Sequence, residues 1–182
     1  MADSEMHYSL PLPVFEKPPK ILIVVAPYYR TIADDLVAGA TRVLEEAGAE
    51  RDLVEVPGAL EIPAAIAMAH RLADFDGYVA LGCVIRGETT HYETVCNDSS
   101  RGLALLNLQG CAVGNGILTV ETSEQAEARA APDGQDKGGG AAAAALHLVA
   151  IARKWAGKTK GVGFRASGED RRPGVAEDKS SP

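Results

Sequence analysis

The central part of the chain alternates between short apolar runs and longer segments in which apolar residues recur at helical spacing. Residues 21–25 form a continuous, mostly β-branched apolar run, which is typical of a strand buried on both faces of a parallel sheet. A helix is predicted to begin at Thr31 and to end at Gly48. Asp34 and Asp35 are expected in its first turn, where the helix dipole favours acidic side chains. The predicted unit is therefore a strand, a loop and a helix.

The same unit repeats through the rest of the central region. Further strands are predicted at residues 53–56, 78–85 and 113–120, and further helices from the second strand to about residue 73 and at residues 93–108, 123–130 and 140–155. Because strands that alternate with helices pair in parallel through right-handed crossovers, the sequence predicts an α/β fold with a single domain. The expected architecture is a three-layer α/β/α sandwich around a four-stranded, flavodoxin-like parallel sheet.

The two ends of the chain differ from this central domain, which we place at residues 19–157. Residues 1–18 contain a cluster of prolines that interrupts any hydrogen-bonded ladder, so an extended N-terminal arm is expected there. Residues 158–182 are rich in glycine, serine and charged residues and nearly free of large apolar side chains. Such a segment buries too little apolar surface to offset its ordering entropy, and we expect a disordered C-terminal tail.

Composition narrows the classes of function. The formal net charge of −7, without a clustered basic face, disfavours a nucleic-acid partner. The three cysteines follow neither metal-ligand nor disulfide-scaffold spacing, which favours a reducing, cytoplasmic compartment. No segment of the sequence approaches the roughly 20 apolar residues that span a bilayer, and the N-terminus lacks the apolar stretch of a signal peptide. No membrane association is therefore expected.

The loops after the predicted strands hold the candidate chemistry, because ligands of open parallel sheets bind at the carboxyl ends of the strands. The loop at residues 86–91 combines Gly87, the hydroxyl groups of Thr89 and Thr90, backbone amides at a helix N-terminus, and the imidazole of His91. Amides and hydroxyls suit a phosphate group, and a nearby histidine can exchange a proton near neutral pH. The alternative is purely structural, with the two threonines capping the helix and His91 on the surface.

Three further features are candidates, each with a structural alternative. Glu61, after a Pro-Gly turn, can accept hydrogen bonds from a polyol or can simply be a first-turn acid favoured by the helix dipole. Tyr28 and Tyr29 offer rings that stack on a heterocycle, although one of them can equally belong to the core. Arg129 stands near the end of a predicted amphipathic helix, where an isolated arginine is usually solvent-exposed. None of these features decides the function by itself.

Taken together and in this order, these segments resemble the lumazine synthase family over roughly residues 20–155. The resemblance is carried by Gly58-Ala59-Leu60-Glu61-Ile62-Pro63, by Gly82-Cys83-Val84-Ile85-Arg86-Gly87-Glu88-Thr89-Thr90-His91, and by Glu124-Gln125-Ala126 before Arg129. The long second string is far more specific than a lone glycine motif. The resemblance implies a transferase of riboflavin biosynthesis, which condenses 5-amino-6-(D-ribitylamino)uracil with 3,4-dihydroxy-2-butanone 4-phosphate to 6,7-dimethyl-8-ribityllumazine, releasing phosphate and water. It implies no metal and no organic cofactor.

The resemblance also implies a role for each candidate residue. His91 matches the family's proton-transfer residue. The pyrimidine and its ribityl chain are expected to contact Tyr28, Ala59, Leu60, Glu61, Val84, Ile85 and Asn115. The phosphate group is expected at Glu88, Thr89 and Arg129, with Lys137 as a further candidate. Because family active sites lie between subunits, Arg129 is expected to reach into the site of a neighbouring copy, and activity is expected to depend on a homo-oligomer.

Several positions depart from the family pattern. Ala26-Pro27-Tyr28 replaces the commoner Gly-Arg-Phe, and Asn115 stands where many members carry an aromatic residue that packs over the pyrimidine. Residues 134–138 resemble a turn whose geometry selects between a pentamer and a sixty-subunit shell, but Asp136 replaces asparagine. The sequence favours a pentamer. Two other functions stay open at this point, namely a flavin- or lumazine-binding paralogue with weak catalysis and a mainly structural assembly protein.

Overall fold

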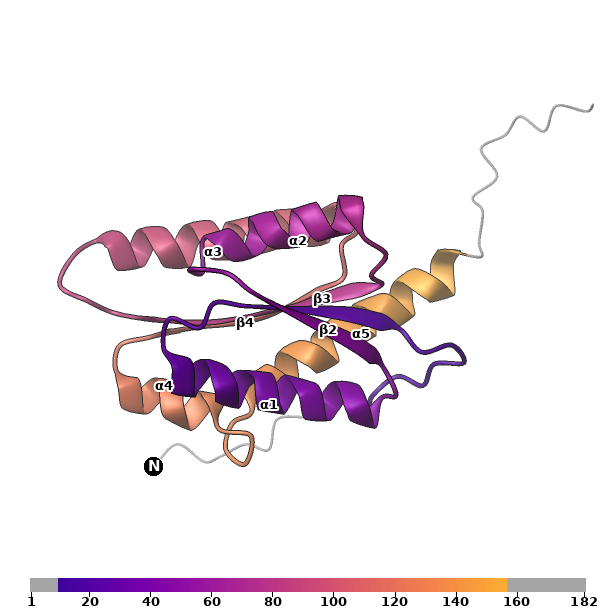
Figure 1. Cartoon of the computed structure of the whole chain (residues 1–182), viewed down its shortest axis with the longest axis horizontal. Helices are drawn as coiled ribbons and strands as arrows, with labels where there is room; N and C mark the ends of the chain where they lie inside the picture. The colour runs from indigo at the N-terminus through magenta and orange to yellow at the C-terminus, as the bar shows by residue number, and fades with distance from the viewer. Residues whose placement is uncertain (1–9, 157–182) are drawn as a thin grey trace, which may run out of the picture.

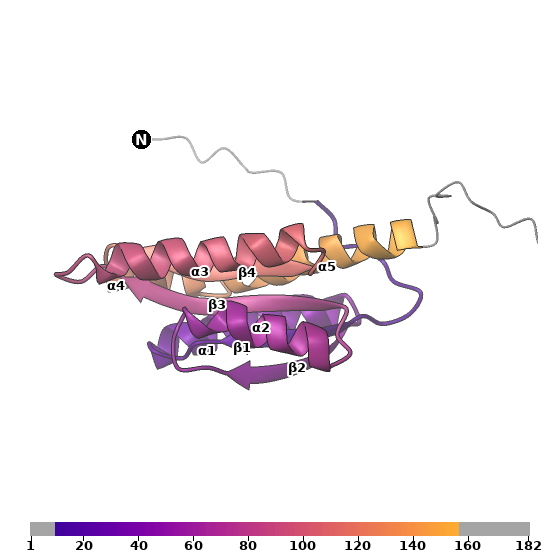
Figure 2. The same ribbon diagram turned by 90° about the horizontal axis from the view of Figure 1, so that it is seen from above.

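The protein folds around a parallel sheet of four strands, as the alternating pattern predicts. The computed structural model describes residues 10–156, so the predicted tail at 158–182 and the first half of the predicted arm lie outside the described residues. The strands are β1 (Lys20–Val25), β2 (Glu50–Glu55), β3 (Gly77–Ile85) and β4 (Val113–Val120). They pair in parallel in the order β2-β1-β3-β4, so that β2 and β4 form the two edges (Figure 2).

Helices cover both faces of this sheet, which confirms the three-layer α/β/α prediction (Figure 1). One face is covered by α1 (Arg30–Glu46), α4 (Ser123–Ala130) and α5 (Lys137–Ala156), and the other by α2 (Glu61–Leu72) and α3 (His91–Leu108). The apolar run of β1 contributes to both layers, because Ile21 and Ile23 face α1 and α5 while Leu22 and Val24 face α2 and α3. This two-sided burial is the reason the run shows no polar alternation.

Several elements begin one to three residues before their predicted starts, and α3 begins at His91 rather than at residue 93. Strand β2 begins at Glu50 rather than at residue 53, and all its residues are exposed, so this edge strand lacks the apolar pattern that would reveal its start. Helix α1 begins at Arg30, one residue early, and the prediction that Asp34 and Asp35 lie in its first turn is wrong. The predicted stop is confirmed, since Gly48 adopts a φ of 68° and its N–H donates to the carbonyl of Glu45.

Helix α5 begins at Lys137, three residues before its predicted start, although glycines occupy its first turn. Asp136 initiates it: this residue has a φ of 43°, and its carboxylate accepts a hydrogen bond of 3.0 Å from the N–H of Gly139. The other carboxylate oxygen lies 2.5 Å from the guanidinium of Arg42 on α1. A side-chain cap and an ion pair therefore replace the helix propensity that the glycines lack.

The same glycines let the α5 backbone approach its neighbours closely. A Cβ at Gly138 would overlap the carbonyl of Leu36 on α1, and a Cβ at Gly114 of β4 would overlap the carbonyl of Ala141. The helix is also rich in alanine, and Ala141, Ala142 and Ala145 are buried. Contact between α5 and β4 is thus made by main chain and methyl groups.

Residues 10–19, the described part of the predicted arm, form neither a helix nor a strand. Phe15 packs against the core on the α1–α5 face, and the guanidinium of Arg153 lies 5.4 Å from the centre of its ring. Arg153 also donates to the carbonyl of Lys17 and to the carboxylate of Asp76. Within residues 10–156, no helix combines the length and the apolar character that a membrane span requires.

Candidate active site

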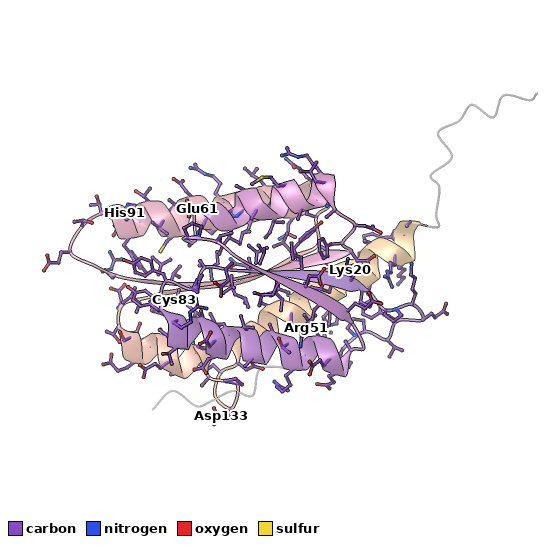
Figure 3. The ribbon with its side chains drawn as sticks, in the orientation of Figure 1. Lys20, Arg51, Glu61, Cys83, His91 and Asp133 are labelled. Carbon is purple, nitrogen blue, oxygen red and sulfur yellow. The ribbon has the colours of Figure 1, made fainter. Side chains whose placement is uncertain are left out.

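A cavity of about 450 Å³ opens at the carboxyl end of the sheet. Its walls come from the segments that follow β1, β2 and β3, and β1 and β3 are the two neighbouring strands whose connections leave in opposite directions. Parallel sheets bind ligands at such a switch point. Figure 3 shows Glu61 and His91 at the starts of α2 and α3, on the side opposite to Lys20 and Arg51, with Cys83 on the strand near them.

Apolar groups form most of the cavity wall. Ala26 and Ala59 are buried, and Val84 and Ile85 at the end of β3 are half-buried. Tyr28 is 76% exposed, and its ring meets that of Tyr29 edge to face at a centroid distance of 5.1 Å. A flat heterocycle therefore finds one free aromatic face and an aliphatic floor.

Polar groups enter the cavity from the first turns of two helices. Glu61 begins α2, and its carboxylate lies against Gly58, where an added Cβ would sit 3.0 Å from Oε2. His91 begins α3, and Thr89 stands just before it. The hydroxyl of Thr89 accepts a long hydrogen bond of 3.4 Å from the N–H of His91, and Thr90, at the N-cap, makes no side-chain cap. Of the structural alternative, Thr89 therefore makes only this long contact and Thr90 makes none, while His91 is exposed as that alternative expects.

A network around Arg86 lies beside the cavity. Nε of Arg86 donates to Glu121 over 2.7 Å, Nη1 donates to Glu93, and the guanidinium lies 4.1 Å from the centre of the Tyr92 ring. The hydrogen bonds to Glu93 and Glu121 raise the pKa of Arg86, and the bond from Arg86 lowers the pKa of Glu93. Both shifts favour the charged forms of Arg86 and Glu93.

Burial favours the neutral form of three groups in the cavity wall. Desolvation raises the pKa of the Cys83 thiol to about 11 and also raises the pKa of the Tyr29 and Tyr92 hydroxyls. None of these groups supplies a negative charge near pH 7. The ionisable carboxyl group that remains in the wall is that of Glu61, and among the described residues that line the cavity there is no lysine or arginine.

Of the residues to which the family resemblance gives a role, eight line this cavity and four do not. The residues that line it are Tyr28, Ala59, Leu60, Glu61, Val84, Ile85, Thr89 and His91. Glu88 is exposed in the same loop but lies outside the wall. Asn115 lines a separate cavity of about 260 Å³ between α3 and β4, and its Oδ1 accepts a 2.9 Å hydrogen bond from the N–H of Ile117. Arg129 and Lys137 line neither cavity, and Nη1 of Arg129 donates to the carbonyl of Gln125.

Sequence reasoning missed three side chains of the wall. Cys83 is part of an apolar strand, Tyr92 follows His91 in a helix, and Val95 lies one turn further. If the start of α3 had been known, helical spacing would have placed Tyr92 and Val95 on the same face of this helix as His91. In residues 10–156, no group of three or more His, Cys, Asp and Glu side chains has an arrangement that could hold a metal ion.

Comparison with a family model and comparison with individual proteins point to the same family. Residues 18–153 match the family described as 6,7-dimethyl-8-ribityllumazine synthase. A protein of that name from Jannaschia sp. (strain CCS1) is 52% identical over 159 residues, which cover 87% of this chain and 89% of the relative. Relatives of the same name from Novosphingobium aromaticivorans and Bartonella tribocorum are 56% and 54% identical, over 75% and 76% of this chain and 98% and 93% of theirs.

Proposed function

Because the chain belongs to the 6,7-dimethyl-8-ribityllumazine synthase family, we propose that it makes this lumazine in riboflavin biosynthesis. The substrates are 5-amino-6-(D-ribitylamino)uracil and 3,4-dihydroxy-2-butanone 4-phosphate. The observation that carries the proposal is the convergence of Tyr28, Glu61, Thr89 and His91, from three different loops, on one cavity. An aromatic face, a polyol acceptor, an anion-binding loop and a proton carrier are what the two substrates need.

The wall suggests how the pyrimidine substrate lies. The ring stacks on Tyr28, whose face is exposed, and rests on Val84 and Ile85. The ribityl chain then extends toward Ala59, Leu60 and Glu61, where the carboxylate accepts hydrogen bonds from its hydroxyl groups. The hydroxyl of Tyr28, absent from the commoner phenylalanine, adds a polar group at the rim.

The phosphate group of the second substrate binds at the loop before α3. Thr89 offers a hydroxyl group, and the backbone N–H groups at the start of α3 carry the positive end of the helix dipole. We assign Glu88 a backbone role there, because its side chain lies outside the wall. This geometry holds the leaving group close to His91.

Positioning and one proton carrier supply the catalysis in this proposal. The substrate's own amine attacks the ketone to form a Schiff base, so the protein needs no nucleophile of its own. Elimination of phosphate and closure of the ring each require a proton to move, and His91 transfers it. The neutral thiol of Cys83 serves only as part of the apolar wall.

A dianionic phosphate in this cavity needs a cation that the wall of one chain does not supply. We propose that Arg129 of a neighbouring copy provides it, with Lys137 as a further candidate for the phosphate and Asn115 as a candidate contact of the pyrimidine. Any assembly that brings Arg129 beside the cavity of the next copy meets this requirement, and we propose the homopentamer that the family resemblance favours. It is proposed to act in the cytoplasm on small-molecule substrates, without nucleic acid or membrane. The free thiols of Cys83, Cys96 and Cys111 agree with a reducing compartment.

The test is direct. Purified protein is mixed with both substrates, and the fluorescent lumazine is followed while released phosphate is measured separately. Stoichiometric formation of both supports the proposal, and no product under conditions where the Jannaschia relative works refutes it. Tight flavin binding without turnover would instead favour a binding paralogue. Native mass measurement of the same sample tests the pentamer.

A further inference from the structure

Arg86 joins three structural elements at the edge of the proposed phosphate site. It follows the last residue of β3, and its N–H donates to the carbonyl of Val120 at the end of β4 over 2.9 Å. Its guanidinium binds Glu121, which follows β4, and Glu93 in the first turn of α3. The side chain therefore spans from the sheet to the helix and bridges the two ends of the loop at residues 87–90.

The loop has few other restraints. Residues 87–90 are all exposed, and a Cβ built on Gly87 would meet no atom within 4 Å. The hydrogen bond from the N–H of His91 to Thr89 is long, at 3.4 Å, and the N-cap residue makes no side-chain cap. A loop that carries a flexible glycine and lacks packing keeps its shape only through its ends.

Arg86 is not part of the cavity wall. Its neighbours Ile85 and Gly87 line the cavity wall, as does Tyr92, on whose ring the guanidinium stacks, but Arg86 does not. Its Nε and Nη1 donate to the carboxylates of Glu121 and Glu93, neither of which lines the cavity. Any effect of Arg86 on a ligand therefore passes through the loop and through Tyr92.

We propose that Arg86 is a positioning residue, which holds the loop at residues 87–90 in the shape that binds the phosphate group. The inference rests on the proposed function and adds a residue whose effect is indirect. It assigns the pair Glu121 and Glu93 the same role, because an arginine fork that bridges two carboxylates fixes both distance and orientation. Loss of this bridge loosens the amide and hydroxyl donors without removing any of them.

Variants of both partners separate positioning from direct binding. In Arg86→Gln, we expect the inhibition constant of inorganic phosphate and the KM of the butanone phosphate to rise about tenfold, with the KM of the pyrimidine within about twofold. Glu121→Gln should weaken phosphate binding in the same direction. If Arg86 bound phosphate directly, releasing it from Glu121 would strengthen binding, so a tighter inhibition constant in Glu121→Gln overturns the proposal.

Arg51→Gln is the matched control. Arg51 is as exposed as Arg86, at 40% against 39%, and makes a 2.7 Å ion pair with Glu45 far from the loop (Figure 3). It should leave all three constants unchanged. Arg86→Lys keeps the charge but not the fork, so it should recover only part of the phosphate affinity.

The outcomes distinguish this inference from the proposed function. If the wild type forms product and Arg86→Gln leaves the inhibition constant of phosphate and the KM of the butanone phosphate unchanged, the positioning role is wrong and the proposed function still stands. If the wild type forms no product, the proposed function is wrong. Calorimetry of phosphate binding to the wild type and to Arg86→Gln then still tests whether Arg86 holds the loop in its binding shape. If Arg86→Gln fails to fold, Glu121→Gln and Glu93→Gln each remove one contact and must still weaken phosphate binding for the inference to stand.

Discussion

Replacing Asp136 with alanine removes three contributions to the turn before α5. The carboxylate caps the N–H of Gly139, pairs with Arg42, and belongs to a residue type that tolerates the positive φ of 43°. Asp136→Asn keeps the cap acceptor and the backbone tolerance and loses only the ionic part of the pair. The two variants therefore separate the cap and backbone contributions from the charge.

The structure gives the expected sizes. Loss of an N-cap costs about 1 kcal/mol, and alanine in the left-handed region costs about another 1–2 kcal/mol. The ion pair is discounted because the side chain of Arg42 is 56% exposed, which leaves about 0.5 kcal/mol. We expect Asp136→Ala to lower the free energy of unfolding by about 2.5–3.5 kcal/mol and Asp136→Asn by about 0.5 kcal/mol.

Thermal and urea unfolding at one fixed protein concentration measure these differences, since assembly makes stability depend on concentration. The alanine variant should lose about 5–10 °C in Tm, and the asparagine variant about 1–2 °C. Arg42→Gln is the control for the ion pair and should resemble Asp136→Asn. Equal destabilisation by alanine and asparagine would show that the charge dominates and would refute this division of the energy.

Three predictions concern the cavity. His91→Ala should slow turnover about 10²-fold without abolishing it, because positioning remains; unchanged kcat in a stopped-flow assay would contradict the proton-transfer role. Arg129→Ala should raise the KM of the butanone phosphate, with a loss of about 1.5–3 kcal/mol in binding energy, and should leave the KM of the pyrimidine nearly unchanged. An equal rise in the KM of both substrates would contradict the assignment of Arg129 to the phosphate group. Burial holds the pKa of Cys83 at about 11, so iodoacetamide should label this thiol slowly at pH 8 and faster as the pH rises toward that value; rapid labelling at pH 8, seen by peptide mass spectrometry, would contradict the burial argument.

The layers of the fold can be predicted from the sequence where a strand is buried on both faces of the sheet. Residues 21–25 form a run that only a strand between two helical layers explains, and the structure has β1 there. The start of β2 was missed because an exposed edge strand carries no such run. The start of α5 was missed because three glycines argue against a helix, and although the cap from Asp136 to Gly139 is local, the Arg42 side chain that holds Asp136 lies 94 positions away in the sequence.

The cavity could be located from the sequence because the carboxyl ends of parallel strands meet at one edge of the sheet. That rule brings Tyr28, Glu61 and His91 to one place, and their binding and catalytic roles stay predictions. The bridging position of Arg86 has no local signature, since its partner Glu121 follows a different strand. The pattern of residues within one chain likewise does not show what Arg129 contacts, because Arg129 lies outside the cavity of its own chain and is proposed to bind phosphate in the cavity of another copy.

The packing of α5 against β4 gives this helix two very different tolerances to mutation. On its inner side, main chain meets main chain at Gly114 and Gly138, so even one added methyl group must displace a layer of the protein. Its outer side carries Leu148, Ile151 and Trp155, all partly or largely exposed, where side-chain size is far less restricted. Libraries that vary this helix should therefore recover only glycine at position 138, small residues at position 141, apolar residues at the buried positions 146 and 149, and broad diversity on the outer side.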